Sequence, residues 1–465
     1  MIKITLRFTS IFCGAVLLSP AVAYAQCAPA DSGCTLGNGN ANSQPGAVSI
    51  SGGGAGGGEW GANVQSAQAI GIGYGAVVGT GSERSVAIGA DAQAKSTGSV
   101  SLGDWAGVGQ NSAGSVAIGK QALVGPDSGV STTVGYWAQS HAEWGTAIGA
   151  GSQIQTGATG GSAFGSGASV GAGSGGATAL GGNARVDANS GGSTAVGNWA
   201  SVAANTSAAN AFGYGAAVGE GAHGASVVGT GASASAGAVN SVAMGYQARA
   251  QAAGAVALGA WTTAGANDAV ALGNGAEATA AGSAALGAGA SATSTNGLAL
   301  GTGASVTGNN AVAIGAGSIA AQDNVVSVGA PGAERRITNL AAGIDPTDAV
   351  NVSQLNEARA AIAQTQDELA DVQLDLAQTQ HNLRAVRNES RAGVAAAIAM
   401  GPVFMPSAPG RTTIAATGSQ WLDHTGVGVN IAHRLNSDTP IVLHGGLSNG
   451  GGDRYAGRVG VAAEF

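Results

Sequence analysis

The sequence predicts a chain of three parts in series: an all-β solenoid head, a coiled-coil helix and four short strands of membrane type. Three observations lead to this fold class. A glycine-centred repeat with even spacing runs from Gly73 to Gly329, an apolar heptad follows it, and residues 411–465 alternate in polarity. Glycine makes up 83 of the 465 residues, against a usual share of about 7%, which excludes an ordinary enzyme domain. With 45% hydrophobic residues, the chain is also a poor candidate for disorder.

Residues 1–25 have the features of a cleaved export signal. Lys3 and Arg7 precede an apolar run, residues 8–22, and Ala23-Tyr24-Ala25 ends it in the small-x-small form of a signal-peptidase site. A single membrane anchor is the alternative, but the run is short and contains Ser and Pro. Removal of this segment moves the net charge from -8 to -10, because it takes two basic residues and no acidic one. An exported protein with this charge lacks the positive field that nucleic acid requires.

Residues 26–60 form a glycine-rich N-terminal segment that contains Cys27 and Cys34. A disulfide closing this short loop fits an oxidising compartment outside the cytoplasm, within one chain or between chains. A metal or redox role is disfavoured, because there is no CxxC motif and no neighbouring His.

Residues 61–332 form the predicted head. Apolar-Gly steps recur at eighteen glycines, with nine intervals of 16 residues and eight of 14. Because both intervals are even, the alternating side chains of a strand keep their faces from end to end. Each copy reads as apolar residues, the glycine, two turn residues and Ala-x-Ala, which predicts two short strands joined by a turn. A unit this small cannot bury its own apolar face, so the copies must stack.

Two side-chain columns carry further expectations. The residue before each repeat glycine is apolar in all eighteen copies, and we expect it to fill the interior. The residue two positions before the glycine is Ala in thirteen copies, and we expect it to face outward. That alanine column is either a tight solenoid wall or a surface for close contact between subunits.

Aromatic residues gather in the turn after the glycine. Four of the six Tyr occupy the first position after it, and four of the seven Trp occupy the second. Equal phase in a stacked solenoid means one longitudinal line, and an exposed line would contact a protein or glycan ligand. The alternative is that the rings pack over the turn or between subunits. The candidate residues are Trp105, Tyr136, Trp137, Trp199 and Trp261.

The sequence gives no indication of a catalytic, cofactor-binding or metal site. Residues 71–75 read GIGYG, but no predicted helix follows them and no acidic residue completes a dinucleotide unit. No Ser/His/Asp set or carboxylate pair recurs at a repeat phase. An enzyme with a β-solenoid domain that degrades polysaccharides is therefore a disfavoured alternative.

Residues 333–354 form a neck and residues 355–392 a stalk. Asp345, Pro346 and Asp348 fit a helix cap, a first-turn proline and a third-position acid, so a helix is expected to start there. A heptad of aliphatic residues then predicts a coiled coil, with a second column three residues after each member. Thr, Ala and Val in the second column do not resemble a dimeric zipper, although the seam alone leaves the number of strands open. The seam residues are Leu355, Ile362, Leu369, Leu376 and Leu383.

Residues 393–465 form the predicted membrane anchor. The helix ends before Pro402, and four segments of alternating polarity follow. In the last segment, Val459 and Val461 share one parity while Arg454 and Arg458 share the other, which is typical of an outer-membrane strand. Four strands cannot close a barrel, so several chains must contribute to it. Two chains would give eight strands and three would give twelve; the seam composition and the lumen width needed for the helices favour three.

The chain resembles the trimeric autotransporter adhesins of the YadA-like family. The resemblance rests on the SVAIG-type head repeats, the neck sequence DAVNVSQLNEA at residues 348–358, the heptad stalk and the anchor with its aromatic end. It implies a left-handed parallel β-roll head, a homotrimer in outer-membrane lipid and a 12-stranded transmembrane β-barrel that exports its own passenger. It also implies that Phe465 is the signal read by the outer-membrane assembly machinery.

The same resemblance implies attachment to host extracellular matrix protein or glycan, or to host cells, from the surface of a Gram-negative bacterium. Autoagglutination or a structural role in biofilm is the alternative. Some members of the family bind collagen through a head motif of the form NSVAIGxxS. The nearest match lies at residues 310–318, and the next, at residues 240–245, lacks the final Ser. The candidate motif residues are Asn310, Val312, Ile314, Gly315 and Ser318.

Overall fold

The structure is a computed structural model that divides the chain into two units, Met1–Arg336 and Ile337–Phe465. It describes residues 25–27, 34–36, 44–51, 61–402 and 404–464. All but the last residue of the predicted signal segment lies outside the described residues, and so does Phe465.

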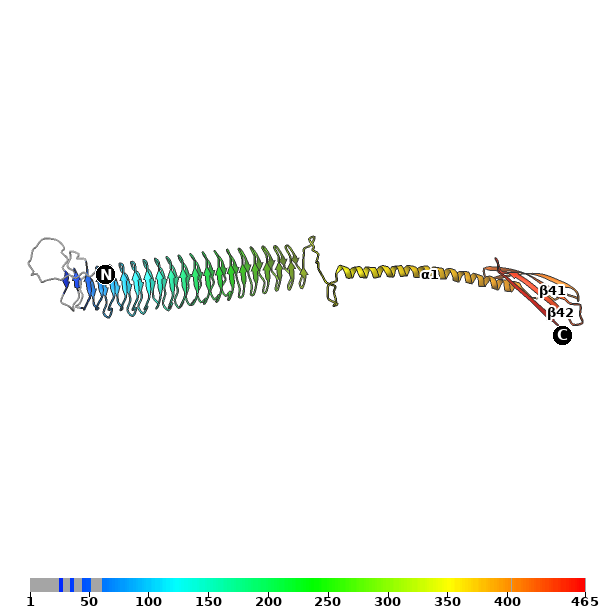
Figure 1. Ribbon diagram of the computed structural model, residues 1–465, viewed down its shortest axis with the longest axis horizontal. Helices are drawn as coiled ribbons and strands as arrows, with labels where there is room; N and C mark the ends of the chain where they lie inside the picture. Colours follow the sequence, from blue (N-terminus) through cyan, green and yellow to red (C-terminus); the bar gives the residue numbers. More distant parts are fainter. Residues whose placement is uncertain (1–24, 28–33, 37–43, 52–60, 403, 465) are drawn as a thin grey trace, which may run out of the picture. The chain divides into compact units, whose positions relative to one another are not determined.

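The first unit is a stack of coils, each built from one three-residue and one two-residue strand (Figure 1). The three-residue strands directly precede the repeat glycines, from β5 (Ile70–Ile72) to β37 (Val312–Ile314), and β39 (Val326–Ser327) ends the series. The two-residue strands begin four residues after a glycine, from β6 (Val77–Val78) to β38 (Ile319–Ala320), with β4 (Asn63–Val64) before them. Each set pairs in parallel from coil to coil. The predicted parallel β-solenoid with two short strands per copy is confirmed.

Three short strands extend the stack toward the N-terminus. Strand β1 (Ala25–Cys27) pairs antiparallel with β2 (Cys34–Leu36), and β2 pairs in parallel with β3 (Val48–Ile50). Strand β3 continues in parallel to β5, so the first sheet of the solenoid starts before the first repeat glycine.

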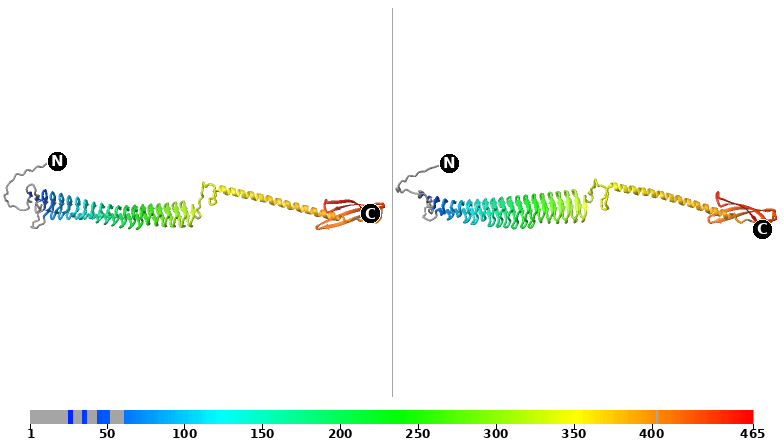
Figure 2. Two further views of the ribbon diagram at one scale, coloured as in Figure 1. Left: turned by 90° about the horizontal axis from the view of Figure 1, so that it is seen from below. Right: turned by 60° about the horizontal axis from the view of Figure 1, so that its bottom comes forward.

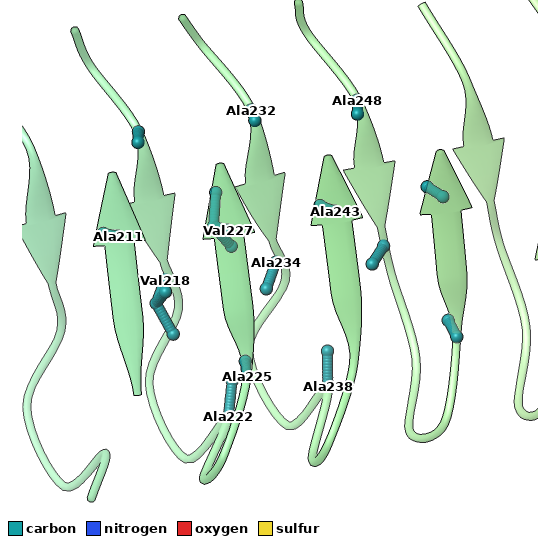
Figure 3. Packing of buried hydrophobic residues seen from close by; sticks show 14 of the residues in the cluster. Ala211, Val218, Ala222, Ala225, Val227, Ala232, Ala234, Ala238, Ala243 and Ala248 are labelled. Atoms are coloured by element: carbon teal, nitrogen blue, oxygen red, sulfur yellow. The ribbon is translucent and has the colours of Figure 1, made fainter. Parts of the chain in front are cut away.

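The interior of the solenoid is lined by the alanine column, contrary to the expectation from the sequence. The middle residue of each three-residue strand is fully buried, as at Ala211, Val227 and Ala243 (Figure 3). The residue before the glycine points outward, and nine members of that column are 37% to 45% exposed. The two predictions, that the apolar column fills the interior and that the alanine column faces outward, are therefore wrong. The space between the two sheets is narrow enough that mainly Ala and Val fill it.

The repeat glycines are required by both conformation and space. From Gly73 to Gly315 their φ angles are positive, for example +130° at Gly73 and +132° at Gly89. A Cβ at either position would lie less than 3.0 Å from the backbone of the next glycine in the column. Because an L side chain rarely adopts this φ and has no room there, the column accepts glycine alone.

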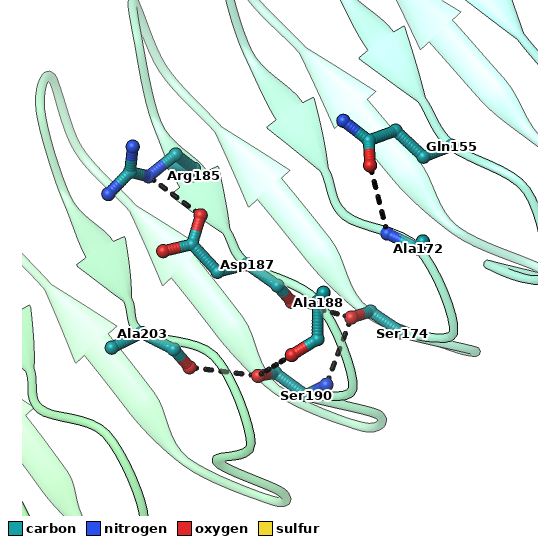
Figure 4. Close-up of polar contacts among 8 residues, drawn as sticks. All are labelled: Gln155, Ala172, Ser174, Arg185, Asp187, Ala188, Ser190 and Ala203. Carbon is teal, nitrogen blue, oxygen red and sulfur yellow. Dashed lines mark hydrogen bonds and ion pairs between the residues drawn. The ribbon is translucent and has the colours of Figure 1, made fainter.

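The two coil lengths differ by one left-handed turn. Every coil has a residue with positive φ five positions before its glycine, such as Gly98. The nine 16-residue coils, the long coils, have another eight positions before it, such as Gly81 and Asp127, whereas the 14-residue short coils do not. The turn that leads from a two-residue strand to the next three-residue strand is called the return turn. Buried hydroxyls support the return turns: the Ser190 N–H donates to Ser174 Oγ at 2.9 Å, and Ser174 Oγ donates to a backbone carbonyl (Figure 4).

The second unit begins with a neck loop and one long helix, α1 (Val352–Ala399). Asn351 is the N-cap, and it forms a capping box with Gln354. The prediction that the helix starts at Asp345 is wrong, because the Asp348 carboxylate accepts the N–H groups of Ile344 and Asp345 and closes a tight loop. Within the described ranges, no helix has the length and apolar character needed to cross a membrane.

The unit ends in a four-stranded antiparallel sheet in sequence order, as predicted (Figure 2). Its strands are β40 (Thr412–Trp421), β41 (His424–Arg434), β42 (Ile441–Asn449) and β43 (Tyr455–Ala463). The C-terminal turns of α1 pack on one face of the sheet, where Ala392, Ala395, Ala396 and Ala399 are buried.

Candidate functional site

The four Trp of the turn column stand at strained and exposed positions. They are Trp105, Trp137, Trp199 and Trp261, with φ between 58° and 62° and 54% to 59% of each residue exposed. Nine of the other fourteen copies have Gly at this position, which adopts positive φ without a steric cost. A bulky L residue in this conformation costs about 1 kcal/mol or more. More than half of each Trp residue is exposed, so packing within the single chain does not account for the bulky side chains at these positions.

The aromatic residues form separate patches rather than one continuous line. Tyr136 lies beside Trp137, with ring centroids 6.4 Å apart. Tyr246 meets Trp261 in the next coil edge to face, with centroids 5.0 Å apart. Trp137, Trp199 and Trp261 are four coils apart, or about 19 Å at a strand spacing of about 4.8 Å. We refer to the exposed aromatic side chains around Trp137, Trp199 and Trp261 as the aromatic patches.

Sequence reasoning missed one exposed aromatic residue. Trp144 is 61% exposed and also has positive φ, but it lies in the return turn, five positions before Gly149. The left-handed column at that position could have been found from its many Gly and Asn residues.

The two outer faces of the solenoid differ in polarity. The face of the three-residue strands carries an apolar stripe, formed by the outward residues directly before the repeat glycines. Outward positions of the two-residue strands instead include Gln93, Gln139, Gln153 and Arg185. An apolar surface of this length is unusual for a monomer and indicates a covered face. The most exposed stripe residues are Leu102, Ile148, Leu180, Phe212, Val228, Met244, Leu272, Leu300 and Ile314.

The residues of the collagen-type motif do not form one surface. Val312 and Ile314 belong to the apolar face, whereas Asn310 lies on the return turn and shares hydrogen bonds with Asn296 and Asn324. The hydroxyl of Ser318 is buried.

Arg335 closes the C-terminal end of the solenoid over this motif. Its Nη1 donates to Ser318 Oγ at 2.6 Å and to the Val328 carbonyl at 2.7 Å. A Cβ at Gly315 would lie 2.9 Å from the same Nη1. Gly315 and Ser318 are therefore brought together under the guanidinium, as part of the end of the stack.

The predicted stalk seam lies along one side of α1 and is exposed in the single chain. Leu355, Ile362, Leu369, Leu376 and Leu383 are 45% to 64% exposed. No described part of the second unit covers them, so their burial requires other helices.

The C-terminal sheet has its apolar side chains on the exposed face. Val427, Val429 and Val459 are exposed there. The face toward α1 is covered and carries small and polar side chains: Asn430 and Ser448 are buried there, as are Ala432 and Val442. This polarity is the reverse of that of a water-soluble sheet packed against a helix.

Polar side chains of the sheet hold the end of the helix. Ser448 Oγ donates to the Ala396 carbonyl at 2.7 Å, and Arg458 Nη2 donates to the carbonyls of Met400 and Gly401 at 3.0 and 2.6 Å. Thr417 and Ser419 donate to further carbonyls of α1. The last carbonyls of a helix have no partners within it, so these contacts satisfy them.

The predicted disulfide partners are paired in the backbone register of two N-terminal strands. The register of β1 and β2 places Cys27 opposite Cys34. Directly opposed residues in an antiparallel pair have Cα atoms about 4.5 to 5.5 Å apart, within the range of a disulfide. Within the described residues, no cluster of three His, Cys, Asp or Glu side chains is suited to hold a metal ion.

Comparisons with known proteins agree with this architecture. A family model described as the YadA head domain repeat (2 copies) matches residues 82–104, 236–260, 264–290, 292–318 and 307–330. A model described as the coiled stalk of trimeric autotransporter adhesin matches residues 336–374. Among solved structures, the collagen-binding domain of the Yersinia adhesin YadA aligns with 20% identity over 54% of this chain and 86% of that chain, with a TM-score of 0.18. No curated protein matches the chain.

The head and stalk models match in the order in which the structure has the solenoid and the long helix. The proteins that these two family models describe are adhesins rather than enzymes. In its head repeats and its stalk, the chain is therefore similar to the YadA-like trimeric autotransporter adhesins.

Proposed function

We propose that the chain forms a homotrimeric adhesin anchored in the outer membrane of a Gram-negative bacterium and displayed on the cell surface. The inverted polarity of the C-terminal sheet carries this proposal. Its exposed face is apolar, as lipid requires, and its covered face holds the end of α1 by polar contacts.

Three features support assembly from several copies. Among the described strands, none pairs with the outer edges of β40 and β43, and lipid does not tolerate open edges. The stalk seam and the apolar stripe of the head are both exposed in one chain. Three chains would close a 12-stranded barrel and bury both surfaces.

Export of the passenger through its own barrel is part of the proposal, and the small residues where α1 meets the sheet support it. Gly426 and Gly428 lie so close to carbonyls of α1 that a Cβ on either would overlap them. Three helices fit one lumen only if such contacts are close. The cleaved signal at residues 1–25 and the recognition of Phe465 by the assembly machinery belong to the same proposal.

Adhesion by the head is assigned to the aromatic patches, with host matrix protein, glycan or cell surface as partner. Three copies of each patch on every trimer raise avidity even where each contact is weak. The residues Trp137, Trp199 and Trp261 are exposed and separated by about 19 Å, so a long polymer could engage several of them.

The test compares cells that display the wild-type protein with cells that display the triple variant W137N/W199N/W261N. Asn tolerates positive φ, so the head keeps its fold. We expect attachment to immobilised matrix proteins and glycans to fall at least tenfold, while the matched variant Trp144→Asn attaches as the wild type does. Attachment by the folded triple variant at the wild-type level would contradict the role of the patches. Clumping of these cells without any matrix would favour autoagglutination instead.

A further inference from the structure

A polar groove of about 560 Å³ crosses the head on the edge opposite to the aromatic patches. Return turns of four successive coils line it. Its polar lining residues are Gln65, Thr80, Lys95, Ser96, Thr97, Gln110 and Asn111. Its size lies within the usual range for small-molecule sites, about 300 to 1,000 Å³.

The groove exists because of the order of coil lengths. The coil from Gly89 to Gly103 is short and lies between two long coils. The extra left-handed turns of the long coils, at Gly81 and Asn111, therefore stand on either side of a recessed turn at Thr97.

The recess also interrupts a hydrogen-bond ladder. Where long coils are adjacent, the N–H of the extra turn donates to the preceding coil: Asp127 donates to the Gln110 carbonyl at 2.9 Å, and Asn189 donates to the Ala172 carbonyl at 2.8 Å. In the described part of the chain, the Asn111 N–H and the Thr80 carbonyl, on the two sides of the groove, have no such partner. A free donor and a free acceptor thus lie on opposite walls.

The side chains of the lining are also available to a ligand. Among the described residues, Gln65, Thr80, Lys95 and Gln110 donate and accept no side-chain hydrogen bond within the protein. Thr97 and Asn111 are engaged: the Thr97 hydroxyl donates to the Gly81 carbonyl at 2.8 Å, and Asn111 Nδ2 donates to Asp127 Oδ1 at 2.9 Å. Amides and a hydroxyl with both donor and acceptor capacity suit a ligand rich in hydroxyl groups.

The lining of the groove carries one positive charge, on Lys95. Lys95 and Lys120 are the only lysines after residue 3. Lys120 is paired with Asp104 at 3.0 Å, and this hydrogen bond raises its pKa. Lys95 has no ion pair within the described residues. Because the chain as a whole is acidic, with a net charge of -8, it repels a polyanion but can accept a single carboxylate beside Lys95.

We propose that this groove binds a saccharide that carries one carboxylate, such as the acidic sugar at the end of a glycan chain. Lys95 pairs with the carboxylate, and the free amides, the Thr80 carbonyl and the Asn111 N–H pair with hydroxyl groups. This inference rests on the proposed adhesive function, for which it names a ligand class.

A second recess in the head provides an internal comparison. The short coil from Gly135 to Gly149 also lies between two long coils, but it has His141 and Glu143 where the groove has Lys95 and Thr97. The carboxylate of Glu143 would repel an acidic sugar, so we expect this recess not to bind it.

The test measures saturation transfer from the full-length trimer in detergent to sialyllactose, lactose and a heparin hexasaccharide. We expect binding of sialyllactose, with much weaker signals for the other two. Lys95→Ala should weaken binding about tenfold or more, because a charge-assisted hydrogen bond is lost, and Lys120→Ala should not change it. Glu83→Gln should tighten binding, since the Glu83 carboxylate lies 3.3 Å from Thr97 Oγ1 at the rim.

A two-residue insertion tests the geometry without changing any lining charge. Insertion of Gln-Asn between Lys95 and Ser96 copies the order Gln110-Asn111-Ser112 and turns the short coil into a long one. It keeps the even register, completes the ladder and fills the recess, so binding should be abolished. The same insertion between His141 and Ala142 is the control and should have no effect. Circular dichroism melting verifies that all variants fold.

Several outcomes would overturn the inference: no binding of sialyllactose by the wild type, equal binding by Lys95→Ala or by the first insertion variant, or a preference for heparin or lactose. Failure of the adhesive function has a different result. In that case the purified trimer binds sialyllactose, but cells that display it attach to no matrix protein, glycan or host cell.

Discussion

Left-handed backbone positions determine which side chains the turns of the head accept. Trp105 has φ of 58° and no aromatic partner among the described residues. We expect Trp105→Asn to raise the free energy of unfolding of the head by about 1 kcal/mol, because Asn adopts this conformation more readily. Chemical denaturation of the purified protein measures the change. A lower stability would mean that the ring packs on a partner chain.

Asp348 gives the neck loop a defined dependence on pH. The N–H groups of Ile344 and Asp345 lower the pKa of its carboxyl below the ordinary value. A lowered folded-state pKa stabilises the loop above the unfolded value of about 3.9, and this stability is lost as pH falls through the folded value. Hydrogen exchange of the two amides should thus be protected at neutral pH and lose protection in acid. In Asp348→Ala the two amides should exchange fast at both neutral and acid pH. Protection in the variant equal to that in the wild type would contradict the role of the carboxylate.

At the scale of the solenoid strand, neighbouring residues have opposite roles. Ala271 is fully buried and Leu272 is 43% exposed. Ala271→Leu should lower the free energy of unfolding by about 1 to 3 kcal/mol through overpacking. Leu272→Ser should preserve the β-sheet signal in circular dichroism and weaken contact between chains instead. If Leu272→Ser loses as much sheet signal as Ala271→Leu, the assignment of inside and outside is in error.

The contact between α1 and the anchor sheet depends on glycine at particular points. A Cβ at Gly428 would overlap the Ala399 carbonyl, whereas one at Gly418 meets nothing within 4 Å. Gly428→Val should therefore displace the helix and lower the heat resistance of the assembled anchor, and Gly418→Val should leave it unchanged. Electrophoresis of heated, detergent-solubilised samples measures both. Equal heat resistance of the two variants would argue against close packing of helix and sheet.

Periodicity explains what the sequence predicts at this scale. Even repeat intervals give the paired strands of the head, the heptad gives α1, and alternation gives β40–β43. The inside and outside of the solenoid could not be assigned in this way, because a three-residue strand such as Val270–Leu272 has apolar residues on both faces. The helix start was missed because Asp348 bonds back to the loop. The groove depends on which coils are neighbours, and single motifs do not reveal that.

For the whole molecule, the unpaired sheet edges predict that the folded anchor is not a monomer. The chain has a mass of 44.0 kDa, and we expect a complex of three chains after extraction in mild detergent. Light scattering with correction for bound detergent measures this mass. A stable single chain with its C-terminal strands inserted in lipid would contradict both the barrel and the proposed function.

The ladder bonds between coils run along the axis of the head, so a pulling force on an attached cell acts on them directly. A long coil that detaches releases 16 residues, or about 50 Å of slack after subtraction of one coil spacing. A short coil releases 14, or about 43 Å. If the coils detach one at a time, the head lengthens in small steps. Each step lowers the force on the contact between the head and its ligand.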